Sequence, residues 1–257
     1  MSPVDPVEPS RRQGLGTTHW PTIRARVSRT AASVGVATGA YGLSFGALAT
    51  AAGLSVPQTC ATSLLIFTGG SQFALIGVLG SGGSGVSGTA SAVLLGSRNL
   101  VYGASIAQLL GLRGARRLVG AQLVIDESTA VALGSHATVE SEASERSLAD
   151  RAGRLGFWST GLAVFLLWNA STLIGALAGS VIGDPRTFGL DAAAPAAFLA
   201  LLAPRLRGRP AWTTAVVAAL VAITVVPLVP AGVPVLVAAL VPVVAVLAKR
   251  SAPGARS

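Results

Sequence analysis

The chain has 257 residues, of which 51% are hydrophobic and only 11% are charged. Soluble domains carry about 25% charged residues, so this composition excludes an ordinary soluble domain and favours a polytopic membrane protein. The net charge of +9 is not attributed to nucleic-acid binding, because the basic residues stand at the ends of apolar segments, where they set membrane topology. Cys60 is the single cysteine, which excludes an intrachain disulfide.

Residues 1–30 are predicted to be a cytoplasmic and largely disordered tail, with Trp20 to Arg29 as a short interfacial helix. This stretch lacks the apolar core of a cleavable signal peptide. Several of the segments that follow approach the ~20 apolar residues that cross a bilayer. The apolar segments lie at about 33–52, 58–80, 86–110, 118–134, 156–182, 189–204, 212–229 and 231–248.

These segments predict an all-α, polytopic integral membrane protein with about six to eight hydrophobic segments, some broken or re-entrant. The membrane domain is expected to cover 31–250, with a C-terminal tail at 251–257. A polar loop at 135–155 is expected to join two halves, 31–134 and 156–250. The halves are candidates for an inverted repeat, because each has glycine-rich segments followed by an acidic residue.

The arginines at 113–117 conflict with a simple count of spans. If the first three apolar segments all crossed the bilayer, these arginines would lie opposite the N-terminal ones, against the positive-inside rule. A re-entrant hairpin over 58–80, broken at Gly69-Gly70, removes the conflict, and 118–134 then becomes re-entrant or broken as well. Four ordinary spans are the alternative. With the hairpin, both termini lie in the cytoplasm.

Small and polar residues interrupt the first two apolar segments. Gly42, Ser44 and Gly46 allow close helix packing, and Ser44 is also a candidate for the solute site. Adjacent glycines at 69 and 70 each cost roughly 1 kcal/mol relative to alanine inside a helix, so a break is expected there. The freed N–H groups of such a break attract a carboxylate. The segment from Thr68 to Gln72 is therefore either a substrate site or a packed kink.

A second group of polar residues follows. An arginine at the centre of a span costs about 2.5–3.5 kcal/mol, so Arg98 should face an acid or a cavity, with Asn99 and Tyr102 extending the same polar patch. Asp126 and Glu127 are adjacent carboxyls that suit proton coupling. The alternatives are a structural ion pair for Arg98 and a helix cap for the two carboxyls. Capping of a helix is also expected for Asp191.

Other chemistry is not indicated. The sequence has no G-x-x-x-x-G-K-[ST] loop for a nucleotide, no metal-ligand set of His, Cys and Asp, and no nucleophile–base pair at a recognisable spacing. Neither an enzyme nor a cofactor or metal is expected.

Five stretches together resemble the AzlC family, the large subunit of branched-chain amino acid exporters (LIV-E family permeases). They are G-L-S-F-G-A-L-A-T-A-A-G-L-S, F-T-G-G-S-Q-F, R-N-L-V-Y-G, D-E-S and G-L-D-A-A-A-P-A-A-F. Gly96 departs from the family pattern, which usually has asparagine there. The resemblance implies export of branched-chain amino acids, and perhaps methionine, across the bacterial cell membrane. It also implies energy from the proton motive force and a small hydrophobic AzlD-like subunit.

The predicted function is thus a membrane transporter subunit, with a passive channel or a scaffold for a membrane partner as the alternative. The apolar side chain of the substrate is expected to rest on Phe45, Phe67 and Phe73, and protons to move through Asp126 and Glu127. The residues expected to bind substrate are Ser44, Gly69, Gly70, Ser71, Gln72, Arg98, Asn99 and Tyr102.

Overall fold

A computed structural model describes residues 19–143, 145–182, 199, 202–203, 206–230 and 232–251. Within these residues the regular structure is helical, without strands, as the composition predicts. Most of the expected apolar segment at 189–204, together with Asp191, lies outside the described residues.

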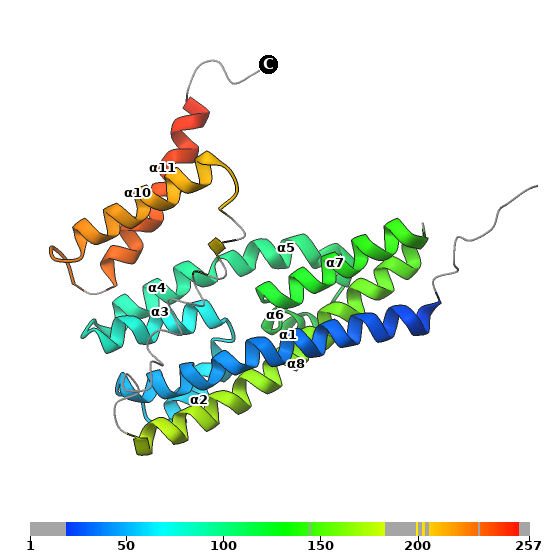
Figure 1. The fold of residues 1–257 in the computed structure, drawn as a ribbon, viewed down its shortest axis with the longest axis horizontal. Helices are drawn as coiled ribbons and strands as arrows, with labels where there is room; N and C mark the ends of the chain where they lie inside the picture. Colours follow the sequence, from blue (N-terminus) through cyan, green and yellow to red (C-terminus); the bar gives the residue numbers. More distant parts are fainter. Residues whose placement is uncertain are drawn as a thin grey trace, which may run out of the picture.

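Two long helices form the central framework of the fold. α1 (Trp20–Ala51) and α8 (Arg146–Ile182) lie against each other along most of their length (Figure 1). They are the two described helices that are long and apolar enough to cross a membrane. Because α1 begins at Trp20, residues 20–30 belong to this helix rather than to a tail, and the helix expected at Trp20 to Arg29 is continuous with the candidate span.

Glycines set the close approach of α1 and α8. A Cβ at Gly42 would lie 2.6 Å from the carbonyl oxygen of Trp168, and one at Gly46 would collide with the Thr172 carbonyl. From the other helix, a Cβ at Gly175 would collide with the carbonyl of Leu43. Small residues let two backbones come this close, so the packing interpretation of Gly42 and Gly46 is confirmed.

The segment after α1 is a helical hairpin. α2 (Val56–Leu65) ends at a non-helical connector of residues 66–68, and α3 (Gly69–Gly80) turns back. A Cβ at Gly80 would lie 3.5 Å from that of Ala52, so α3 ends beside the point where α2 begins. Gln72 donates to the carbonyl of Ser63 across the hairpin at 3.2 Å. The break falls just before the glycine pair, where the sequence predicted one, and the re-entrant topology stays a prediction.

α4 (Gly85–Gly96) and α5 (Arg98–Leu110) are two parts of one bent helix. Ser97 between them keeps helical dihedral angles, φ −58° and ψ −25°. Their combined path leads from the open end of the α2–α3 hairpin, past its tip, to α7 (Figure 1). Together α4 and α5 cover the apolar segment expected at 86–110, and Arg98 lies next to the bend.

A second broken element follows. α6 (Ala115–Gln122) ends at residues 123–125, and α7 (Asp126–Ala143) starts at the first acidic residue. The break between α6 and α7 lies beside the tip of the α2–α3 hairpin, where the Gln122 side chain donates a hydrogen bond to the carbonyl of Leu64 at 2.8 Å. Segment 118–134 is therefore broken, as one of the sequence alternatives states.

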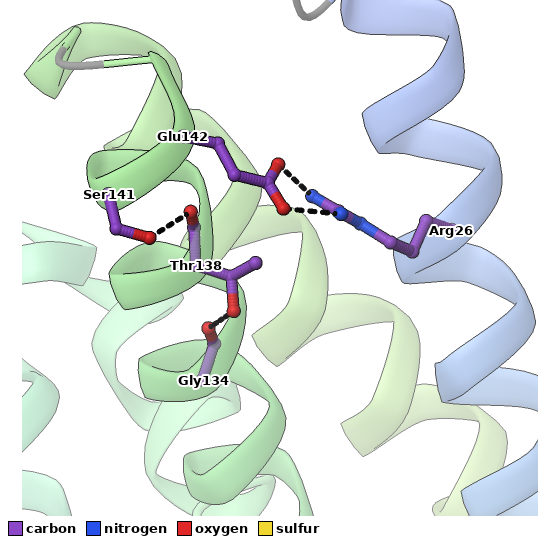
Figure 2. A network of polar contacts seen from close by, with 5 residues as sticks. All are labelled: Arg26, Gly134, Thr138, Ser141 and Glu142. Carbon is purple, nitrogen blue, oxygen red and sulfur yellow. Dashed lines mark hydrogen bonds and ion pairs between the residues drawn. The ribbon is translucent and has the colours of Figure 1, made fainter.

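Charged residues gather where α1 begins and where α7 passes into α8. Arg26 makes a bidentate hydrogen bond with Glu142, 2.8 Å from each Nη to its carboxylate oxygen (Figure 2). The Arg151 guanidinium lies 3.9 Å above the ring of Trp20. The polar loop expected at 135–155 is wrong, because residues 135–143 continue α7 and 146–155 begin α8.

The last described helices, α10 (Arg209–Val225) and α11 (Val233–Ser251), pair with each other beside α4 (Figure 1). The segment between α10 and α11 contacts α4 at Gly232, whose backbone carbonyl accepts a hydrogen bond from the Ser91 hydroxyl at 3.4 Å. No described residue of α10 is buried.

Large apolar side chains cover much of the outer surface. Leu65 and Leu100 are each 77% exposed, and Val181 is 85% exposed. A soluble monomer rarely exposes apolar patches of more than a few hundred Å². Lipid or a hydrophobic partner is the environment that such a surface requires.

Candidate functional site

The two helix breaks open into one central cavity of ≈ 200 Å³. A cavity of about 150 Å³ holds benzene, so this one suits a solute only somewhat larger. We call it the central cavity. It is lined by Thr38, Tyr41, Phe67, Thr68, Gly69, Gly70, Phe73, Arg98, Ile125, Asp126, Glu127, Val164 and Trp168.

The N-terminus of α3 forms one wall of the central cavity. Its first residues, Gly69 and Gly70, have no side chain between their backbone and the cavity. Thr68 is the N-cap, but its side chain makes no capping hydrogen bond, and the first turn carries no acidic residue. The first N–H groups of a helix lack partners within the helix and carry partial positive charge. This wall therefore offers uncompensated donors to an anionic group.

The opposite polar wall comes from α5 and α7. Arg98 Nη1 lies 3.3 Å from Asp126 Oδ2, and their side chains are 31% and 12% exposed. Arg98 Nε and Asp126 Oδ1 are buried without hydrogen-bond partners among the described residues. The ion pair thus leaves one donor and one acceptor unused. Glu127 lines the same wall.

Aromatic rings make the remaining wall. Phe73 and Trp168 meet edge to face, with centroids 6.2 Å apart, and Phe67 packs on Phe165 in the same manner at 5.0 Å. The indole Nε1 of Trp168 is buried without a partner among the described residues. Buried polar atoms generally have partners, so a solute or water is the natural acceptor for this N–H.

Ser128 holds the second break in shape. Its hydroxyl accepts from the N–H of Ile125 at 3.2 Å and donates to the carbonyl of Leu123 at 2.6 Å. These bonds satisfy backbone groups that the break leaves without helical partners. The D-E-S motif therefore combines two cavity-facing carboxyls with the hydroxyl that positions them.

Half of the sequence-predicted residues meet at the central cavity. Of the proposed substrate and proton residues, it is lined by Gly69, Gly70, Arg98, Asp126 and Glu127. The ion-pair alternative for Arg98 describes a real contact with Asp126, and it is compatible with a role in the cavity. Asp126 and Glu127 stand in the first turn of α7, and the helix-cap alternative for them stays a prediction.

The other five predicted residues lie outside the lining of the central cavity. Ser44 is buried in α1, and Gln72 is fully buried and bonded within the hairpin. Ser71 and Asn99 line a neighbouring chamber, and Tyr102 packs against the hydrophobic core. Phe45, which was expected to contact the apolar side chain of the substrate, is fully buried. Its ring packs on the rings of Phe73 and Trp168.

Sequence reasoning missed several lining residues, chiefly Thr38, Tyr41 and Trp168. Trp168 had a visible signal, because a tryptophan deep in an apolar run requires a partner for its N–H. Among the described residues, no group of three or more His, Cys, Asp or Glu could hold a metal ion.

Comparisons with known proteins agree with the membrane interpretation. The AzlC protein family model matches residues 33–182. An uncharacterized membrane protein of Archaeoglobus fulgidus is 36% identical over 167 residues, covering 64% of this chain and 68% of the relative. No solved structure matches.

Proposed function

The chain belongs to the AzlC family, and we propose that it exports branched-chain amino acids across the cell membrane as the large subunit of a proton-driven transporter. The observation that carries this proposal is the central cavity between two helix breaks, with charged groups on one side and aromatic rings on the other. Transporters commonly bind solutes where broken helices meet.

The arrangement of the cavity suits a zwitterion with an apolar side chain. The carboxylate binds the free N–H groups of Gly69 and Gly70, since helix N-termini attract anions. The ammonium group approaches Asp126 and Glu127. The aliphatic side chain then rests on the wall that contains Trp168. The size of the cavity favours single amino acids over peptides.

Glu127 is the leading proton carrier in this proposal. Asp126 is already paired with Arg98, whereas no ion pair of Glu127 occurs among the described residues. A carboxyl at membrane depth generally has a functional role. Protonation of Glu127 would weaken its attraction for the ammonium group, so release of the solute and uptake of a proton are linked. Asp126 joins the cycle when the ion pair opens.

The partner in this proposal is a small hydrophobic AzlD-like subunit. The described part of α10 exposes Val216, Val217 and Leu220. Lipid also satisfies such a surface, and the partner assignment rests on family membership rather than on this feature. Expression with and without the small subunit distinguishes the two.

The proposal is tested by efflux of preloaded isoleucine from cells that lack their own exporters. Cells with this chain and its small partner should release isoleucine faster than cells with the partner alone. The Glu127→Gln variant should lose uphill export. The matched control is Glu140→Gln, which alters an exposed carboxyl at the far end of α7. Retention equal to that of empty cells would refute the exporter assignment.

A further inference from the structure

A second hollow lies on the other side of the two helix breaks, and it opens to the outer surface beside Leu65 and Leu100, each 77% exposed. Its volume is ≈ 470 Å³, and we call it the side chamber. Phe67 and Thr68 line both chambers. At the other break, Val124 lines the side chamber and Ile125 lines the central cavity. The partition between the chambers is therefore built from the two non-helical connectors.

The side chamber contains buried polar atoms that the fold does not use. Ser71 is 1% exposed, and its Oγ has no hydrogen-bond partner among the described residues. The Oδ1 atom of Asn99 is likewise buried without one. Leaving such an atom unsatisfied is unfavourable, so both atoms indicate a polar ligand.

Gly96 keeps this space open. A Cβ at Gly96 would lie 3.0 Å from Ser71 Oγ, so any side chain there would project toward the hydroxyl. No lining residue of the side chamber is charged among the described residues. Its polar groups are hydroxyls and amides, which bind an amino acid more weakly than the ion-paired wall of the central cavity.

We propose that the side chamber is a second, weaker station for the same amino acid, reached from the central cavity through the partition at Phe67 and Thr68. This inference rests on the proposed function. Ser71 and Asn99 hydrogen-bond the head group there, with Asn99 Oδ1 accepting from the ammonium. A strong site followed by a weaker one lets a solute leave as well as enter, as conduction requires.

Thr68 is suited to be the moving part of the partition. It lies in the connector between α2 and α3, and its N–H donates to the carbonyl of Ile66 rather than to a helical partner. Its side chain makes no capping bond. A change in the backbone at this connector would join the chambers without moving either long helix.

Cysteine accessibility tests the proposal, because Cys60 is the single native cysteine. In a Cys60→Ser background, Thr38→Cys reports on the central cavity and Ala92→Cys on the side chamber. Ser141→Cys, on an exposed turn of α7, is the control. Each full-length variant is reacted in membrane vesicles, together with the small subunit, with a small water-soluble methanethiosulfonate, with and without isoleucine.

Isoleucine should slow the reaction at both chambers and leave the control unchanged. By mass action, the slowing is about tenfold at ten times the Kd of a station, and the side chamber should need more isoleucine. Protection of Thr38→Cys alone, or an Ala92→Cys that never reacts, would overturn the second station while leaving the exporter proposal intact. Protection at neither position would contradict both.

A space-filling variant gives a second measurement. Gly96→Val should lower isoleucine efflux severalfold, because it fills the side chamber, while isoleucine still protects Thr38→Cys. Efflux unchanged by Gly96→Val would overturn the proposal.

Discussion

Arg98 and Asp126 form an ion pair between the start of α5 and the start of α7, with Nη1 and Oδ2 3.3 Å apart. Each residue follows an interruption in a helix, at Ser97 in one case and at residues 123–125 in the other. The pair therefore ties two interrupted segments together at the edge of the central cavity. Its opening would free both charges for the solute.

Removing one member of this pair should destabilise the protein more than removing both. Breaking a fully buried pair costs on the order of 3 kcal/mol, because the remaining charge is left without a partner, whereas apolar replacement of both is often neutral. Arg98 is 31% exposed, so the cost here should be smaller. We expect Arg98→Gln to lower the Tm in detergent and Arg98→Met with Asp126→Leu to recover most of the loss. A double variant that is less stable than the single one would contradict this role.

Close packing of α1 and α8 predicts a strong effect at Gly42. A Cβ there would lie 2.6 Å from the Trp168 carbonyl, so Gly42→Val should separate the helices and lower the Tm markedly. The control is Gly77→Ala in α3, where an added Cβ meets nothing within 4 Å. This change should be neutral or stabilise by up to about 1 kcal/mol. Equal Tm values for the two variants would refute the close approach.

Trp168→Phe should weaken isoleucine binding while the fold persists. The variant keeps an aromatic ring but loses the indole N–H, which has no protein partner among the described residues. An ordinary hydrogen bond to the solute or to a bound water contributes about 0.5–1.5 kcal/mol, so affinity should fall about two- to tenfold. Isoleucine binding is measured by calorimetry, with Trp158→Phe, outside the central cavity, as the control. Unchanged affinity would remove Trp168 from the site.

The Arg26–Glu142 ion pair predicts that the stability of the folded protein depends on pH. The hydrogen bond from Arg26 holds the pKa of Glu142 below its ordinary value of 4.5. Its folded form thus binds a proton less readily than its unfolded form, so the stabilisation is present at neutral pH and is lost as the pH falls through the lowered pKa. The effect is small, because both side chains are exposed.

Thermal unfolding between neutral pH and pH 3 measures this contribution. The wild-type protein should lose slightly more stability on acidification than Glu142→Gln, which has no carboxyl to titrate at that position. Identical pH profiles for the two proteins would show that the pair contributes nothing in solution.

The sequence predicted the helical class, the breaks and the charged half of the cavity. The adjacent glycines locate the first break, because helix propensity is a local property of the sequence. The arginines at 113–117 support a break in that segment through the positive-inside rule. Contacts between segments that are distant in the sequence were harder to predict. Which face of α3 carries Ser71 and Gln72 depends on the hairpin packing, and Thr38 is recruited only because α1 lies beside α7 and α8. The polar run at 135–155 was misread because charged residues also fill exposed helix ends.

The central claim is coupled transport through Glu127 and the central cavity. It is tested most directly in vesicles that contain this chain and its small partner, with an acidic interior and radioactive isoleucine outside. Exchange of protons for solute should accumulate isoleucine inside above its external concentration. Accumulation should vanish with a proton ionophore and in Glu127→Gln, but persist in Glu140→Gln. Isoleucine that only equilibrates, at the same rate with or without the gradient, would contradict the account and indicate a passive channel.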